Sequence, residues 1–230
     1  MNTSIHSFGR TAGQLSAVER NRVLRNTYAL LALSMVPTVL GAWIGVTTGI
    51  TAGLTGFMGM IVFLGGAFGF MFAIEKTKNS AAGVPVLLAF TFFMGLMLSR
   101  LVGQVLGLAN GASLIMTAFA GTGAIFLGMA TLSSVIKRDL SSMGKFLFIG
   151  AIMLLVAGVA NMFIKSSALM ITLSVLAIGI FSAFILYDLK RVQDGEETNY
   201  ISATLGVYLS LYNVFQSLLA LLGIAGGRDE

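Results

Sequence analysis

The sequence predicts an all-α, polytopic membrane protein of seven transmembrane helices, with the last helix enclosed by the other six. Hydrophobic residues make up 57% of the 230 residues and charged residues only 10%, whereas soluble domains carry about 25% charged residues. The apolar residues form seven continuous runs, each close to the ~20 residues that span a bilayer core. Because these runs are continuous and do not alternate, the sequence excludes a transmembrane β-barrel.

The chain divides into a cytosolic N-terminal tail, residues 1–26, and a transmembrane domain, residues 27–230. The tail is polar, and its composition favours disorder or a weak interfacial helix around residues 15–24. Every later apolar run is expected to be helical, because the bilayer core offers no water to backbone groups. The expected spans are residues 28–49, 53–74, 84–106, 113–136, 146–164, 168–187 and 200–225.

The distribution of Lys and Arg predicts the orientation of the spans in the membrane. Most basic residues fall in the tail and in the second, fourth and sixth connectors, so the positive-inside rule places these segments in the cytoplasm. Seven crossings then put the C-terminus outside the cytoplasm, unless the last run re-enters the membrane without crossing it. The first apolar run follows a polar tail without a cleavage pattern, and we expect it to remain as an anchor.

The last apolar run carries a stripe that predicts a central position. Four small or polar residues are spaced by four, three and four positions, so they share one helix face. Such residues let helices approach closely and hydrogen-bond to one another. We therefore expect protein, not lipid, around this helix, with Asp188 beside it. The stripe consists of Gly206, Ser210, Asn213 and Ser217.

Two other features of the spans are a pair of glycines and a single arginine. Gly65 and Gly69 have the small-xxx-small spacing typical of tight helix contacts. Arg100 lies in the outer third of its span, where its side chain is expected to extend to the outer surface. A pore-lining role for Arg100 is the alternative, and in either case it lies at the opposite face from Asp188.

Asp188 is the main candidate for a functional group, and two interpretations stay open. It lies at the cytoplasmic end of its span, and Arg191 follows at a spacing that allows an ion pair. The other interpretation turns the carboxylate into the bundle, near Ser210 and Asn213. There it would act as a pH-sensitive gate or a weak calcium contact.

The loop after Asp188 is acidic and precedes the last helix. Glu196 and Glu197 are secondary candidates for a cation, but one loop supplies too few oxygens for a calcium site. Thr198 or Asn199 is expected to cap the last helix. A solvated acidic loop is the simpler interpretation.

Composition excludes several classes of function. Cysteine is absent and the single histidine, His6, lies in the tail, so thiolate or histidine metal sites and cysteine catalysis are not expected. Neither a phosphate-binding loop nor a Ser-His-Asp set is present, and we predict neither enzyme activity nor a cofactor. The net charge of +5 comes from scattered basic residues beside apolar runs, which indicates membrane flanks and not nucleic-acid binding.

Several short stretches together resemble the Bax inhibitor-1 (transmembrane Bax inhibitor motif) family, and most closely its YccA-like bacterial branch, which modulates the membrane protease FtsH. The loop at 195–201 and the entry to the first span are the specific matches. The stretches are VLRNTYALL at 23–31, KRD at 137–139, VANMF at 159–163, ILYD at 185–188, GEETNYI at 195–201 and YLSLYNVF at 208–215.

The resemblance implies a seven-helix fold with an enclosed last helix, in a bacterial inner membrane with the C-terminus in the periplasm. It also implies two activities in different branches. One is a pH-sensitive calcium leak gated by two aspartates on the last two helices. Asp188 matches the first aspartate, but Ser210 occupies the position of the second and cannot share a proton in that way. The other activity is binding and slowing of FtsH through the N-terminal tail. We favour protease modulation, with the cation leak as the alternative.

Overall fold

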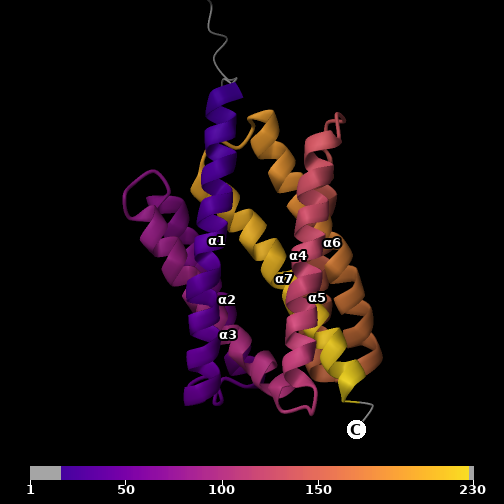
Figure 1. Ribbon diagram of the computed structural model, residues 1–230. Coiled ribbons are helices and arrows are strands. Elements are labelled where there is room, and N and C mark those ends of the chain that lie inside the picture. Colours follow the sequence, from indigo (N-terminus) through magenta and orange to yellow (C-terminus); the bar gives the residue numbers. More distant parts are fainter. Residues whose placement is uncertain (1–16, 228–230) are drawn as a thin grey trace, which may run out of the picture.

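The computed structural model describes residues 17–227, and within them the chain forms seven helices (Figure 1). His6 and the other residues of 1–16 and 228–230 lie outside the described part. The helices are α1 (Ala17–Thr48), α2 (Gly56–Thr77), α3 (Gly83–Leu106), α4 (Gly111–Val135), α5 (Met143–Ile164), α6 (Ser167–Asp194) and α7 (Tyr200–Gly226).

All seven helices are long and apolar enough to cross a membrane, which confirms the predicted fold class. The last helix has 27 residues, and at ~1.5 Å per residue it reaches about 40 Å. This exceeds the ~30 Å bilayer core, so α7 has the length to cross fully. The start of α1 and the end of α7 lie at opposite ends of the bundle (Figure 1).

The first helix begins earlier than the sequence predicts. We expected the first span to start at Tyr28, but α1 starts at Ala17 and is 32 residues long. An acidic residue in its first turn, Glu19, is favourable at the positive end of the helix dipole. Residues 17–26 are therefore the first turns of α1, and they carry the helix beyond the apolar part of the span.

The last helix occupies the centre of the bundle. It runs obliquely between α1 and α4 (Figure 1) and packs against α1, α3, α4 and α6, with a smaller contact to α2. The main partner of α2 is α3, and α5 packs mainly against α6. Only Gln216 and Ala225 are exposed between Tyr200 and Gly226. The predicted enclosure of the last helix by protein is confirmed.

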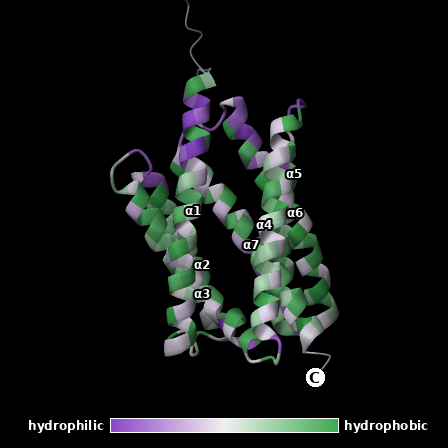
Figure 2. Ribbon diagram, viewed as in Figure 1, coloured by the Kyte–Doolittle hydropathy of each residue, from purple (hydrophilic) through white to green (hydrophobic). Residues whose placement is uncertain are grey.

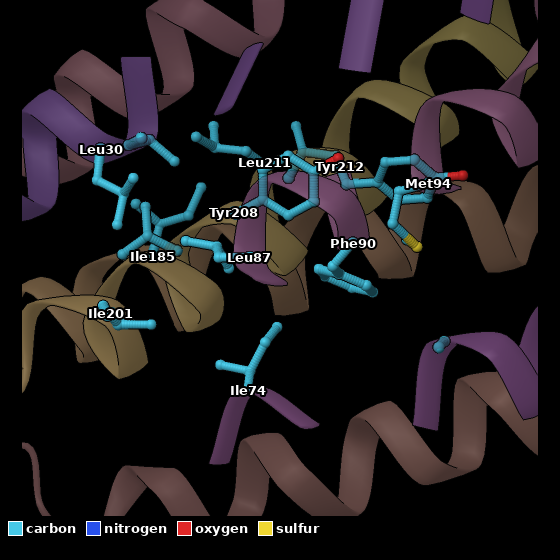
Figure 3. Packing of buried hydrophobic residues seen from close by; sticks show 14 of the residues in the cluster. Leu30, Ile74, Leu87, Phe90, Met94, Ile185, Ile201, Tyr208, Leu211 and Tyr212 are labelled. Atoms are coloured by element: carbon cyan, nitrogen blue, oxygen red, sulfur yellow. The ribbon is translucent and has the colours of Figure 1, made fainter. Parts of the chain in front are cut away.

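The hydrophobic core forms where α7 meets its neighbours. Tyr208 of α7 is buried beside Phe90 of α3, with the two ring centroids 6.0 Å apart. Leu87, Ile185 and Ile201 lie in the same cluster (Figure 3). Side chains from α1, α2, α3, α6 and α7 therefore share one core, to which α5 contributes no buried residue.

The closest helix contact joins α1 to α3 and depends on glycine. A Cβ atom on Gly41 would collide with the carbonyl oxygen of Phe92, and one on Gly95 would collide with that of Thr38. The prediction of a tight helix contact at Gly65 and Gly69 is wrong within this chain. Both residues are exposed on α2, and a Cβ atom at either position would meet nothing within 4 Å.

Polar residues gather at the end of the bundle that holds the start of α1, the end of α6 and the α4–α5 loop (Figure 2). At this end Gly195 ends α6 with φ 82°, a left-handed conformation that suits glycine. Asn199 then caps α7, as expected, by accepting hydrogen bonds from the N–H groups of Ile201 and Ser202. Its amide group also donates to the carbonyl oxygen of Lys78 at 3.1 Å. The cap thus connects α7 to the α2–α3 loop.

The glycine contact gives a first prediction. We expect Gly41→Ala to lower the midpoint of thermal unfolding in detergent, because the added methyl group forces the α1 and α3 backbones apart. Overpacking of this kind costs about 1–3 kcal/mol. The matched control is Gly69→Ala, which adds the same methyl group where nothing lies within 4 Å. It is expected to leave the midpoint unchanged or slightly raised, and equal losses in both variants would contradict the prediction.

Candidate functional site

The carboxylate of Asp188 lies against the central helix. Asp188 is near the end of α6, and its side chain packs on Gly206 of α7. A Cβ atom on residue 206 would come 2.8 Å from Oδ2 of Asp188 and 3.5 Å from Oδ1. The absence of a side chain at Gly206 therefore makes the space that the carboxylate occupies.

Asp188 has no ion-pair partner among residues 17–227. The ion pair with Arg191 that the sequence suggested is not formed, because Arg191 pairs with Glu196 at 3.6 Å and lies over the ring of Tyr187. Arg191 and Glu197 are the charged groups that act on Asp188 through space. Of the two interpretations, the structure favours the one in which the carboxylate faces the bundle.

The stripe on α7 is not one connected site. Ser210 is only 4% exposed, but no hydrogen bond joins it to Asp188 in the described part of the chain. Asn213 donates to the carbonyl oxygen of Leu209 on its own helix at 2.8 Å. Asp188 therefore meets α7 at Gly206, one turn before Ser210, and the structure does not bring Asp188, Ser210 and Asn213 together as a hydrogen-bonded group.

The secondary candidates, Arg100 and Glu197 among them, form hydrogen bonds that stabilise loops and helix ends. Arg100 is exposed and donates a hydrogen bond to the carbonyl oxygen of Leu54, which ties the end of α3 to the α1–α2 loop. Glu197 accepts a hydrogen bond from the backbone N–H of Asn199 at 2.9 Å. Within residues 17–227 no three Asp, Glu, His or Cys side chains are grouped as metal ligands would be. A calcium contact at Asp188 thus has no supporting acidic cluster there.

A hydroxyl group in the core joins three helices, and the sequence analysis did not identify it. The Tyr208 hydroxyl of α7 lies 2.9 Å from the Thr38 hydroxyl of α1 and donates to the carbonyl oxygen of Thr91 on α3 at 3.4 Å. The Thr38 hydroxyl is also 2.8 Å from the carbonyl oxygen of Ser34. Thr38 follows Pro37, the one proline inside α1, and no spacing in the sequence relates it to Tyr208.

A second set of polar contacts joins α1, α6 and α4 near the end of α6. Arg20 of α1 donates to the carbonyl oxygen of Gln193 on α6 at 3.2 Å. The Gln193 side chain donates in turn to the hydroxyl of Ser133 on α4 at 2.8 Å. A small open pocket at this point is lined by Ala17, Arg20, Asn21, Leu24 and Gln193. The early start of α1 is what brings Arg20 to α6.

The contact between Asp188 and Gly206 gives a second prediction. We expect Gly206→Ala to destabilise the protein by about 1–3 kcal/mol, because the new methyl group displaces the carboxylate. In an Asp188→Ala background the same substitution should cost less, and a double-mutant cycle on thermal or denaturant unfolding measures this coupling.

The control for that cycle is Gly179→Ala on α6, where a Cβ atom would meet nothing within 4 Å. Its effect should simply add to that of Asp188→Ala. If the effects of Gly206→Ala and Asp188→Ala also prove additive, the contact between the carboxylate and Gly206 does not contribute to stability as predicted.

Comparison with known proteins identifies the family. Residues 20–227 match the model of the family described as "Inhibitor of apoptosis-promoting Bax1". The "Modulator of FtsH protease YccA" of Escherichia coli K12 is 36% identical over 214 residues, which cover 93% of this chain and 94% of that protein. An "Uncharacterized membrane protein" of Vibrio cholerae is 36% identical over the full length of both chains. This seven-helix chain, with its enclosed last helix, belongs to the Bax inhibitor-1 family.

Proposed function

We propose that this protein is an inner-membrane modulator that binds the membrane-embedded ATP-dependent protease FtsH and slows it. The observation that carries the proposal is the likeness, over 93% of the chain, to an E. coli protein named as a modulator of that protease. The corresponding protein of a second E. coli strain is named an inner membrane protein. The proposal is one of binding and assigns no catalytic reaction to the chain.

The anchoring of α1 supports a role in slowing the protease. Residues 1–16 lead directly into α1, so a protease that gripped them would pull on that helix. Near its start α1 is held by Arg20, and about two turns further in its Thr27 carbonyl oxygen accepts a hydrogen bond from Thr204 at 3.4 Å. Deeper in the bundle the Thr38–Tyr208 contact and the glycine contact with α3 hold it. Extraction of α1 would have to break all of these contacts.

The cation leak gains less support. Ser210 cannot ionise, and Asp188 is neither hydrogen-bonded to it nor grouped with other acids in residues 17–227. The proton-sharing pair that the resemblance connects with calcium release is therefore incomplete at Ser210. Without that pair, no specific observation favours a channel over a protease modulator.

The protease proposal predicts a role for the residues ahead of α1. Deletion of residues 2–16 should abolish co-purification with FtsH, because it removes the segment that the protease is proposed to grip. It leaves every described helix intact, including Arg20, so the unfolding midpoint in detergent should not change. The measurement is pull-down of the protease from solubilised membranes that contain each form of the protein.

The matched control replaces residues 2–16 by the same amino acids in scrambled order. A scrambled segment that retains binding would mean that the protease needs a free segment there and reads no particular sequence. A truncated protein that co-purifies as well as the intact chain would exclude the tail as the attachment point.

We also propose that the polar end of the bundle faces the cytoplasm, from the positive-inside rule. The chain has no cysteine, so a single introduced thiol reports one position. We expect a membrane-impermeant maleimide to label Ala52→Cys, in the α1–α2 loop, on intact spheroplasts. Ser141→Cys, in the α4–α5 loop, should react only after lysis, and the reverse pattern would invert the proposed orientation.

A further inference from the structure

The α4–α5 loop carries basic side chains that are exposed and unpaired. Lys137 and Arg138 lie in this loop and Lys145 lies in the first turn of α5. Within residues 17–227 none of the three forms an ion pair or a side-chain hydrogen bond. At the same end of the bundle Lys78 pairs with Glu75 and Lys190 pairs with Asp194. The cations of the α4–α5 loop thus remain available to an anion from outside the chain.

The one acidic residue of this loop is engaged by the loop itself. The carboxylate of Asp139 accepts a hydrogen bond from the backbone N–H of Ser141 at 2.7 Å. This bond lowers the pKa of Asp139, and the positive charge of Lys190 lowers it further. Asp139 therefore stays ionised at neutral pH, but it is one carboxylate beside three cations, and the loop keeps a positive charge.

The surface next to the basic loop is apolar. Val135, at the end of α4, is 68% exposed, and Phe146, at the start of α5, is 74% exposed. Phe148 and Ile149 continue the exposed surface along α5. Since α5 packs mainly against α6, these side chains are left to the surroundings. Exposed charged and apolar side chains therefore lie next to one another where α4 ends and α5 begins, at the polar end of the bundle (Figure 2).

We propose that the α4–α5 loop is a binding site for an anionic phospholipid, with Lys137, Arg138 and Lys145 on its headgroup phosphate. The acyl chains would lie along Val135, Phe146 and Ile149. Charge complementarity selects the headgroup, because basic residues beside a membrane attract anionic lipids. The apolar surface selects a lipid over a soluble anion, which would leave that surface unused. The site uses none of the residues to which the proposed protease contact is assigned.

The test compares lipids on the purified, full-length protein in neutral detergent. Phosphatidylglycerol should raise the unfolding midpoint, whereas phosphatidylcholine with the same acyl chains should not. In the triple variant K137Q/R138Q/K145Q the apparent affinity for phosphatidylglycerol should fall roughly fivefold for each charge removed, at low salt. Single substitutions should give graded losses, and they keep the test informative if the triple variant unfolds.

The matched control removes three positive charges elsewhere at the same end: R22Q/R25Q/K76Q. It should keep the response to phosphatidylglycerol. An equal loss in both triple variants would overturn the proposal in favour of diffuse attraction to the whole end. Two other results would also overturn it: an equal response to phosphatidylcholine, or the same response to inorganic phosphate.

Discussion

The structure depends on the enclosure of α7 by other helices. A helix with glycine, serine, asparagine and tyrosine along its length is costly in lipid, and it becomes stable when neighbouring helices supply close contacts and hydrogen bonds. α7 meets α1, α3, α4 and α6, and its Tyr208 hydroxyl joins α1 to α3 through Thr38 and Thr91. The two outer helices, α2 and α5, depend on α3 and α6 and reach the central helix little.

Much of this fold could be predicted from the sequence, because the bilayer imposes simple rules on length and polarity. The seven spans, the central α7 and the Asn199 cap follow from apolar runs, residue spacing and capping preferences. Side-chain partners could not be predicted in the same way. Arg191 turned to Glu196 and not to Asp188, and the glycine contact formed at Gly41 and Gly95 and not at Gly65 and Gly69. Those outcomes depend on helix rotations, which spacing alone does not determine.

The candidate site shows the same division. That Asp188 faces the bundle was one of two interpretations from the sequence, and its neighbour, Gly206, was already part of the predicted stripe. The sequence did not predict which residue the Asp188 carboxylate would contact. Ser210 and Asn213 share a helix face with Gly206, yet neither forms a hydrogen bond with the carboxylate. Arg20 was assigned to the tail, so its contact with Gln193 was not expected. That contact makes α1 both the continuation of the tail and a fixed part of the bundle. Under the proposed function, the protease would engage the tail and this contact would resist its pull.

The contact between α1 and α3 has a consequence for how the bundle can change shape. Where two backbones touch, neither helix can slide or rotate without one carbonyl group striking the other chain, so α1 and α3 behave as a single rigid unit. α2 packs on α3 and so belongs to that unit. In the other half of the bundle, α4 and α5 both pack on α6. Any opening of the bundle is therefore expected along the two flanks of α7, where flexible side chains such as those of Thr204 and Tyr208 make the hydrogen bonds to α1 and α3.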